Sequence, residues 1–331
     1  MIGAIPMNRP GWAAVMRQAG AFVDVILHIG AHRTGTTTFQ SYLRDNADAL
    51  KTSGIGFWGP RRTRRGLFAG ILPRPAVANR RNREQRGIGR VRLSCAATEN
   101  KGYTHLVISD ENMIGSVGEN LGKLSLYPGV GERMARYAQA FSDRPSRVFL
   151  TIRALDRFWA SSLGYGLSRG CRLPTKDDVE KLATGRRSWR DVITDVACAM
   201  PASEITVLPF ETYGGQPDAQ LALMTGKNPP RNQTRDWLNA TPHQPQLRQI
   251  VQARGEDCAA LTGTGRWYPF DTAQVMALRE TYLDDLFWLH AGADGLATFI
   301  NGTGTDRMGR KPAVVHDARG QSNDDEEKEV G

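Results

Sequence analysis

The sequence predicts a three-layer α/β/α fold in which helices cover both faces of a mostly parallel sheet. Four short runs rich in β-branched and apolar residues recur along the chain, at residues 23–29, 104–109, 146–152 and 204–208. Each run is followed by polar or helix-like sequence, and this alternation is typical of βα units with parallel strands. The chain of 331 residues can form one large α/β domain, and we expect residues 21–302 to be that single domain.

The first predicted strand, at residues 23–29, leads directly into a helix. This helix begins near Gly35, and Phe39, Tyr42 and Leu43 share one of its faces. A longer amphipathic helix is predicted late in the chain, and we expect it to pack on the sheet. Its apolar residues recur three and four positions apart: Val275, Leu278, Tyr282, Leu286 and Leu289.

Three segments do not follow this alternation. Residues 1–20 mix Met, Pro, Gly and Arg without a period, and we expect an irregular N-terminal arm. In residues 61–92 arginines recur every few positions and Glu84 is the only acidic residue, which favours an insertion outside the core. Residues 303–331 lose the apolar period and contain the acidic run 324–329, so we expect a disordered acidic tail.

The composition bounds the class of protein. No apolar run approaches the roughly 20 residues that span a bilayer, and the N-terminus lacks the uninterrupted apolar core of a secretory signal. We therefore expect a cytoplasmic protein without a transmembrane segment. The cysteines lie far apart with no Cys-x-x-Cys pair, and the histidines show no ligand spacing beside them, so neither zinc nor a disulfide framework is predicted.

The net charge of +9 comes mostly from arginine, whose planar fork matches phosphate, sulfate and carboxylate groups. An anionic ligand is therefore expected. A nucleic-acid-binding module is one alternative, but base stacking needs aromatic residues among the arginines, and residues 61–92 contain only Phe68. We rank nucleic acid last among the candidate ligands. No heptad or exposed apolar edge indicates an oligomeric state.

Residues 30–38 follow the first strand and have the composition of a phosphate-binding loop. In the order strand, tight loop, helix, backbone N–H groups and the positive helix end converge on an anion. Gly30 and Gly35 permit unusual dihedral angles and close backbone approach. Four threonine hydroxyls can add donors to the same cradle: Thr34, Thr36, Thr37 and Thr38. A glycine-containing loop without a ligand, or a degenerate nucleotide site, is the alternative.

The position of the cation in this loop resembles the phosphosulfate loop of sulfotransferases. The P-loop of nucleotide kinases has lysine after the second glycine, where this chain has Thr36. Sulfotransferases carry Lys-[Ser/Thr]-Gly-Thr-Thr after a buried strand, and residues 33–37 read Arg-Thr-Gly-Thr-Thr. His-Ile-Gly before this run and Thr-Phe-Gln-Ser-Tyr-Leu after it are similar to bacterial members. The family usually has lysine where Arg33 stands, and the resemblance implies that Arg33 contacts the oxygen that bridges phosphate and sulfate.

A second motif follows the strand predicted at residues 146–152. In sulfotransferases an arginine at a strand end and a serine eight residues later hold the 3′-phosphate of the donor, and Arg153 and Ser161 have this spacing. Arginine can make a bidentate contact, and the serine lies about two helical turns further on. The alternative is that Arg153 and Arg157 form surface ion pairs with Asp156 or other neighbours.

Asp110 and Glu111 follow the strand predicted at residues 104–109, at the end where open α/β sheets bind ligands. Several sulfotransferases place a glutamate base on the acceptor side, so Glu111 is the candidate base that accepts the proton of the acceptor. The alternative for this pair is a helix N-cap with a first-turn acid. His32 and His105 are further candidates for the base.

The resemblance covers about residues 22–290, including weaker matches at 207–213 and 232–234. A glycine-rich loop for the adenosine is not identified, and residues 226–230 are only a faint substitute. The resemblance implies transfer of a sulfuryl group from 3′-phosphoadenosine 5′-phosphosulfate, the donor co-substrate, to a hydroxyl or amine. The acceptor is a small molecule, carbohydrate or lipid, and residues 61–92 are its candidate lid or else a solvated loop. No metal is predicted, since protein cations can stabilise the departing phosphate.

A P-loop kinase or NTPase is the alternative function. It shares the predicted sheet and loop, but it needs a lysine after Gly35 and an acidic magnesium ligand. The sulfotransferase interpretation makes a geometric demand: the loop of residues 33–38 and the Arg153–Ser161 motif must face one cleft, at opposite ends of one bisphosphorylated nucleotide.

Overall fold

A computed structural model describes residues 23–72, 80–230 and 238–302. Its strands are β1 Asp24–His28, β2 Ile55–Trp58, β3 His105–Ser109, β4 Pro145–Ile152, β5 Glu204–Pro209 and β6 Thr298–Phe299. They form a six-stranded sheet in the order β2-β3-β1-β4-β5-β6, and every pairing is parallel. The predicted α/β class with helices around a parallel sheet is therefore confirmed.

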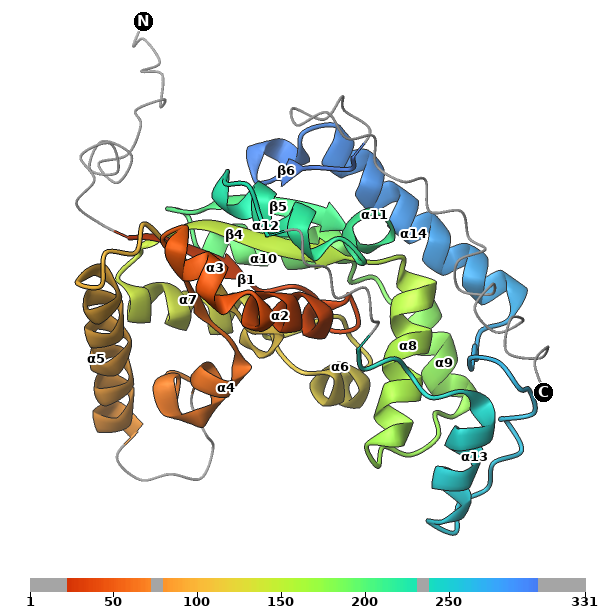
Figure 1. The fold of residues 1–331 in the computed structure, drawn as a ribbon. Coiled ribbons are helices and arrows are strands. Elements are labelled where there is room, and N and C mark those ends of the chain that lie inside the picture. Colours follow the sequence, from red (N-terminus) through yellow and green to blue (C-terminus); the bar gives the residue numbers. More distant parts are fainter. Residues whose placement is uncertain (1–22, 73–79, 231–237, 303–331) are drawn as a thin grey trace, which may run out of the picture.

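Helices flank both faces of this sheet (Figure 1). The helices that precede β4 are α2 Thr36–Asp45, α3 Ala47–Thr52, α4 Pro60–Arg62, α5 Arg80–Glu99, α6 Val117–Lys123 and α7 Val130–Phe141. Those that follow β4 are α8 Leu155–Ser168, α9 Lys176–Ala183, α10 Trp189–Ala199, α11 Phe210–Tyr213, α12 Pro217–Thr225, α13 Gln244–Gln252 and α14 Thr272–His290. A π-helical turn covers Thr63–Leu67, and 3₁₀ turns cover Glu111–Met113 and Ala293–Gly295.

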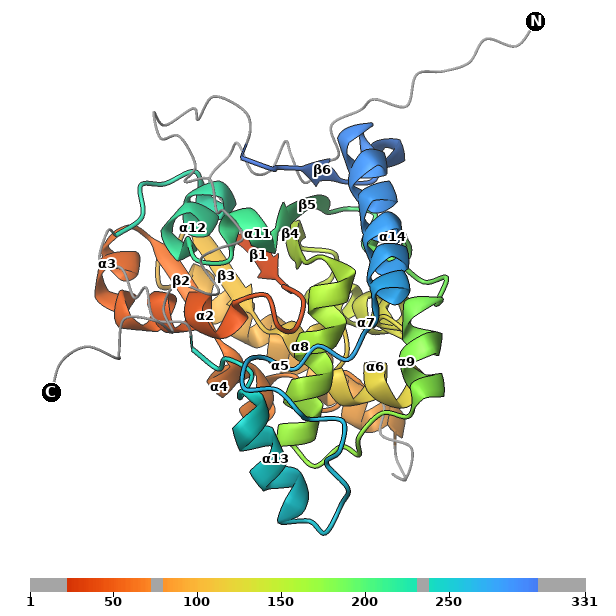
Figure 2. The same ribbon diagram turned by 90° about the vertical axis from the view of Figure 1, so that its right-hand side faces the viewer.

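The core is divided by the sheet into two layers. In β1, Val25 and Leu27 belong to the larger cluster, under α7 and α10, whereas Ile26 belongs to the smaller one, under α2 and α12. Figure 2 shows the sheet between these two sets of helices. All three side chains are fully buried, because successive side chains of a strand point to opposite faces. This explains why the strands read as continuous apolar runs rather than as alternating ones.

The strand order places a topological switch point at the carboxyl end of β1. β1 lies between β3 and β4, with His28 paired to Ser109 on one side and to Phe149 on the other. Successive connections run to opposite sides of β1, and open α/β sheets bind ligands at such a switch point. The segments that follow β1, β3 and β4 therefore meet at one edge of the sheet.

The predicted strands and the late helix lie where the structure has them, but the structure contains two strands that were not predicted. The four predicted strands correspond to β1, β3, β4 and β5, whereas β2 and β6, of four and two residues, were not predicted. Short strands give too few residues for a period to be recognised. The predicted late helix is α14, which buries Leu278, Tyr282 and Leu289 and contacts α8, α9, α10 and β6.

The arginine-rich stretch 61–92 is not one irregular insertion. Its last part belongs to α5, which packs against α7. Leu67, Ile71 and Val91 of the stretch belong to the larger core cluster, so the prediction of an insertion outside the core is wrong for these residues. Residues 73–79 lie outside the described residues, as do the predicted arm 1–20 and the predicted tail 303–331.

Candidate functional site

The segment that joins β1 to α2 forms the floor of the candidate site. A methyl group at Gly30 (φ 38°) would lie 2.4 Å from Thr36 Cγ2, and one at Gly35 (φ 78°) would lie 2.8 Å from the Gly214 carbonyl oxygen. Glycine is therefore required at both positions. Gly35 also precedes α2, which has no side-chain cap and no acidic residue in its first turn. The positive end of α2 is thus open to an anion.

The threonine side chains of this loop contact other groups of the protein, whereas the sequence predicted that their hydroxyls add donors for an anion. Thr34 donates its hydroxyl proton to the Ala31 carbonyl at 2.6 Å, and the Thr38 hydroxyl accepts from the Leu238 N–H at 3.3 Å. The Thr36 methyl group packs against Gly30, and Thr37 is half-buried. The backbone N–H groups at the start of α2 are therefore the better candidates for anion contacts.

Arg33 has a left-handed backbone (φ 65°) and points toward α8. Its Nε donates to Ser161 Oγ at 3.1 Å, and its Nη2 donates to Thr241 Oγ1 at 2.8 Å. Its guanidinium lies 4.8 Å from the ring centre of Tyr165. These three contacts thus fix the plane of the Arg33 guanidinium. A lysine could not make the same set of contacts, because its ammonium group is not planar.

Arg153 follows β4 and lies against the same loop. Its Nη1 donates to the Arg33 carbonyl at 2.9 Å, and its guanidinium lies 4.5 Å from the ring centre of Phe210. Its Nε is buried and has no hydrogen-bond partner in the part of the chain that the structure describes. Trp189 Nε1 donates to the Arg153 carbonyl at 2.8 Å and so fixes the backbone at this strand end.

The two arginines place two positive charges close together. Burial lowers the pKa of both guanidinium groups to about 10; the charges of Arg33 and Arg266 add to this effect at Arg153, and the Glu211 carboxylate opposes it. Within the described ranges, neither Arg33 nor Arg153 forms an ion pair with a carboxylate. A buried charge without a partner is costly. This arrangement therefore favours binding of an anion between the two groups.

The loop of residues 33–38 and the Arg153–Ser161 motif lie side by side, and the distance between them is shorter than the sequence led us to expect. Arg33 contacts Ser161 directly, whereas the sequence led us to expect them at opposite ends of a ligand. The alternative for Arg153, an ion pair with Asp156, is not observed, because Asp156 accepts from Arg279 Nε at 3.0 Å and from the Tyr268 hydroxyl.

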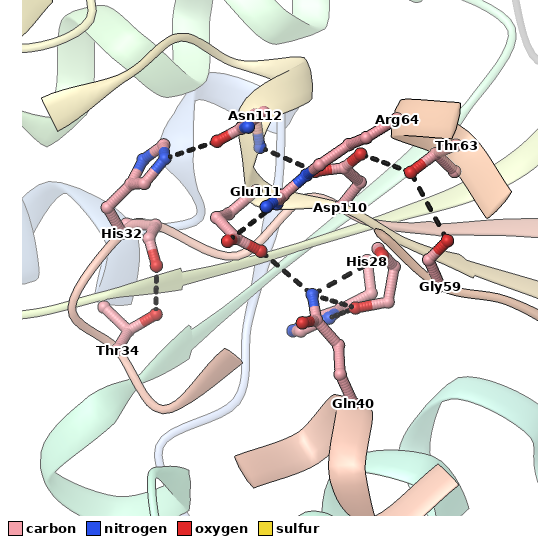
Figure 3. A network of polar contacts seen from close by, with 12 residues as sticks. His28, His32, Thr34, Gln40, Gly59, Thr63, Arg64, Asp110, Glu111 and Asn112 are labelled. Atoms are coloured by element: carbon pink, nitrogen blue, oxygen red, sulfur yellow. Dashed lines mark hydrogen bonds and ion pairs between the residues drawn. The ribbon is translucent and has the colours of Figure 1, made fainter. Parts of the chain in front are cut away.

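Glu111 lies on the other side of the site, after β3 (Figure 3). Arg64 Nη2 donates to Glu111 Oε1 at 2.9 Å and to Asp110 Oδ1 at 2.7 Å. The Asp110 carboxylate also accepts from the Asn112 N–H at 3.1 Å and caps the short turn that follows. The alternative of a helix N-cap with a first-turn acid is therefore confirmed, with Asp110 as the N-cap and Glu111 as the acidic residue of the first turn, and the Glu111 carboxylate also accepts from Gln40 of α2.

Gln40 connects Glu111 to the helix that follows the anion loop. Its Nε2 donates to Glu111 Oε2 at 2.9 Å and to Ser109 Oγ at 3.2 Å. Ser109 Oγ in turn lies 2.8 Å from His28 Nδ1. Burial lowers the pKa of His28 to about 4, against a smaller opposite effect of Glu111, so this histidine is neutral near pH 7. Figure 3 shows these groups as one continuous network.

His32 lies beside Glu111 but is held in a neutral form. The Tyr127 hydroxyl accepts from the His32 N–H at 2.8 Å, so its own proton is directed to His32 Nδ1 at 2.9 Å. His32 Nε2 then donates to Asn112 Oδ1 at 3.0 Å, an assignment that follows from the network. Burial lowers the pKa of His32 despite the nearby Glu111. Neither ring nitrogen then has a free lone pair, whereas each Glu111 oxygen keeps one beside its contact with Arg64 or Gln40, so His32 is a weaker candidate base than Glu111.

Two sequence candidates do not join this site. His105 is the first residue of β3, at the amino end of the strand, and its Nδ1 lies 2.9 Å from Thr104 Oγ1. Lys227, in the stretch considered for the adenosine, also contacts Thr104, 2.9 Å away, and the Ser53 carbonyl. The Asn-Gln-Thr match at 232–234 lies outside the described residues.

Several site residues were not identified from the sequence. Tyr165 lies one helical turn after Ser161, and Gln40 lies within the run that resembles bacterial sulfotransferases, so both had a detectable signal. Arg64 was included in the arginine-rich stretch without a role of its own. Thr241 had no signal, because it comes from a segment about 80 residues after Ser161 that crosses the site only in the folded chain.

No protein-family model matches this chain, and a search of curated proteins finds no match. Among the described residues, no group of three or more His, Cys, Asp and Glu side chains is arranged to hold a metal ion. Over the same ranges, no helix has the length and apolar character needed to cross a membrane. The functional interpretation therefore depends on the site geometry and on the sequence motifs.

Proposed function

We propose that this protein transfers a sulfuryl group from 3′-phosphoadenosine 5′-phosphosulfate to a hydroxyl or amine of an acceptor. One observation carries the proposal. Arg33 and Arg153 lie side by side at the carboxyl edge of the sheet, half-buried and without a carboxylate partner among the described residues, next to the uncapped N-terminus of α2. Such an arrangement suits a ligand with more than one anionic group.

The donor is assigned to the two motifs. The 5′-phosphosulfate takes the N–H groups at the start of α2 together with Arg33, and the 3′-phosphate takes Arg153 and Ser161. The resemblance of residues 33–37 and of the Arg153–Ser161 spacing to sulfotransferases supports this division. The buried Nε of Arg153, which has no partner within the described ranges, supplies an unused donor for an anion.

The chemistry needs a base and a stabilised leaving group. Glu111 accepts the proton from the acceptor while the acceptor oxygen or nitrogen forms a bond to sulfur. The bond from sulfur to the bridging phosphate oxygen breaks at the same time, and its electron pair leaves with adenosine 3′,5′-bisphosphate. Arg33 offsets the negative charge that develops on this departing phosphate. The acceptor belongs to the carbohydrates, lipids or other small molecules.

Calorimetric titration tests the proposal. We expect adenosine 3′,5′-bisphosphate to bind more tightly than adenosine 5′-monophosphate, because only the former can contact Arg153 through a 3′-phosphate. ATP is expected to bind more weakly than the bisphosphate, since Thr36 replaces the lysine that a nucleotide kinase needs. Tight binding of ATP with no binding of the bisphosphate would instead support a P-loop kinase or NTPase.

A further inference from the structure

We propose that Arg64 is a positioning residue that keeps Glu111 ionised and oriented beside the anion loop. The inference rests on the proposed role of Glu111 as base. It also gives a function to the first part of the arginine-rich stretch 61–92, since Arg64 comes from the turn Thr63–Leu67.

The position of Arg64 is fixed by Asp110. Arg64 Nε and Nη2 donate to Asp110 Oδ1 at 3.0 and 2.7 Å, and Asp110 is itself only 2% exposed. Thr63 donates to the other oxygen of the same carboxylate. Two neighbouring residues of one turn, Thr63 and Arg64, thus bind the single buried carboxylate of Asp110. From this position Arg64 Nη2 also donates to Glu111.

The turn itself is anchored to the body of the protein. Thr63 is buried, and the Arg62 guanidinium lies 4.4 Å from the ring centre of the buried Trp58. Gly66 has φ 128° and lies at a kink within the turn. The Arg64 side chain is itself 41% exposed, so its position depends on the buried Asp110 carboxylate and on the buried Thr63 beside it.

The groups that face Glu111 come from five parts of the structure. They are Arg64 from the turn Thr63–Leu67, Gln40 from α2, His28 and His32 from β1 and the loop after it, Asp110 from the end of β3, and Tyr127 from the segment before α7. Of these, Arg64 supplies the only full positive charge near neutral pH, because His28 and His32 have lowered pKa values.

These surroundings set the charge state of Glu111. Burial alone would raise the pKa of this carboxyl, but the Arg64 guanidinium, through its charge and its hydrogen bond, opposes burial, and the pKa lies below its usual range. Without Arg64, burial and the negative charge of Asp110 would favour the protonated form. A protonated Glu111 could not accept a proton from the acceptor.

The test is an NMR titration of the full chain labelled with ¹³C at the glutamate carboxyl carbons, with Glu111→Gln identifying the Glu111 signal. In Arg64→Gln we expect the midpoint of the Glu111 titration to rise by about one pH unit or more. In Arg64→Lys, which keeps the charge, we expect less than half of that rise. The matched control is Arg65→Ala, which removes an exposed arginine of the same turn and should leave the midpoint unchanged.

An Arg64→Gln midpoint equal to that of the unmodified protein would overturn the proposal, and so would a rise in Arg64→Lys as large as in Arg64→Gln. Should Arg64→Gln fail to fold, Arg64→Met is a second neutral replacement of similar length, and the same rise is expected. The titration uses no donor and no acceptor. Failure of this proposal is therefore distinguishable from failure of the proposed sulfuryl transfer, which is tested by nucleotide binding.

Discussion

Arginines occupy both sides of the site, but they do so in opposite electrostatic settings. On the side of β3, Arg64 contacts two carboxylates; burial alone would lower its pKa, but hydrogen bonding and attraction to Asp110 raise it above its usual range. On the side of β4, Arg33 and Arg153 contact hydroxyls, a carbonyl and aromatic rings, and burial lowers the pKa of each to about 10.

The two sides therefore differ in whether their arginines contact a carboxylate within the described part of the protein. In the group of Arg64, Asp110 and Glu111, both carboxylates contact the one guanidinium, which leaves a net charge of −1. The pair of Arg33 and Arg153 keeps two positive charges partly out of water without a carboxylate partner in the described chain, at a cost in folding free energy. A bound anion would offset that cost, so the β4 side indicates ligand binding and the β3 side indicates chemistry.

The largest expected effect concerns the β3 side. Glu111→Gln keeps the shape and the contact with Gln40 but removes the base, and we expect turnover to fall by about 10²–10⁴. Turnover is measured as release of adenosine 3′,5′-bisphosphate from the sulfated donor with one acceptor held constant. Binding of the bisphosphate should be nearly unaffected. Unchanged turnover in this variant would show that Glu111 is not the base.

The next effect concerns Arg33. We expect Arg33→Ala to reduce turnover by about 10²–10³, because the variant removes a charge that stabilises the departing phosphate. Arg44→Ala, at an exposed arginine in the last turn of α2, is the matched control and should retain full turnover. Equal activity of Arg33→Ala and the unmodified protein would remove the proposed role of Arg33.

Arg153 is expected to affect binding more than turnover. A charge-assisted hydrogen bond contributes about 1.5–3 kcal/mol, so Arg153→Ala should weaken bisphosphate binding by roughly 10–150-fold. The same variant should bind adenosine 5′-monophosphate almost as well as the unmodified protein does, because that ligand has no 3′-phosphate. Equal losses for the two nucleotides would assign Arg153 to a different part of the ligand.

The smallest expected effect is at Tyr165. Its ring contacts the Arg33 guanidinium, and a cation–π contact contributes about 0.5–2 kcal/mol. Tyr165→Leu should therefore weaken bisphosphate binding by roughly 2–30-fold. In an Arg33→Ala background the same substitution should have no further effect. An equal loss in both backgrounds would mean that Tyr165 acts on the fold and not through Arg33.

The sequence predicted the β4 side better than the β3 side. Arg33, Arg153 and Ser161 belong to local motifs whose spacing can be read along the chain, and the structure brings all three together. The contacts of Glu111 come from residues 40 and 64, which precede it by 71 and 47 positions. No local pattern encodes such contacts, because they depend on how β1, β2 and β3 are ordered in the sheet.

The strands and helices, too, could be predicted from the sequence only where a local pattern is strong. Strong apolar runs identified β1, β3, β4 and β5, but β2 and β6 are too short to show a period. The helix α5 was hidden by its arginines, since only a few of its residues are buried against the core. Local composition thus predicts the centre of the sheet, while its edges and the elements beside them depend on tertiary packing.

A crystal structure of the protein with adenosine 3′,5′-bisphosphate would test the central claim most directly. We expect the 5′-phosphate at the start of α2 near Arg33, and the 3′-phosphate in contact with Arg153 and Ser161. A nucleotide bound elsewhere, or one whose 3′-phosphate points away from Arg153, would contradict the assignment of these two arginines to a single ligand.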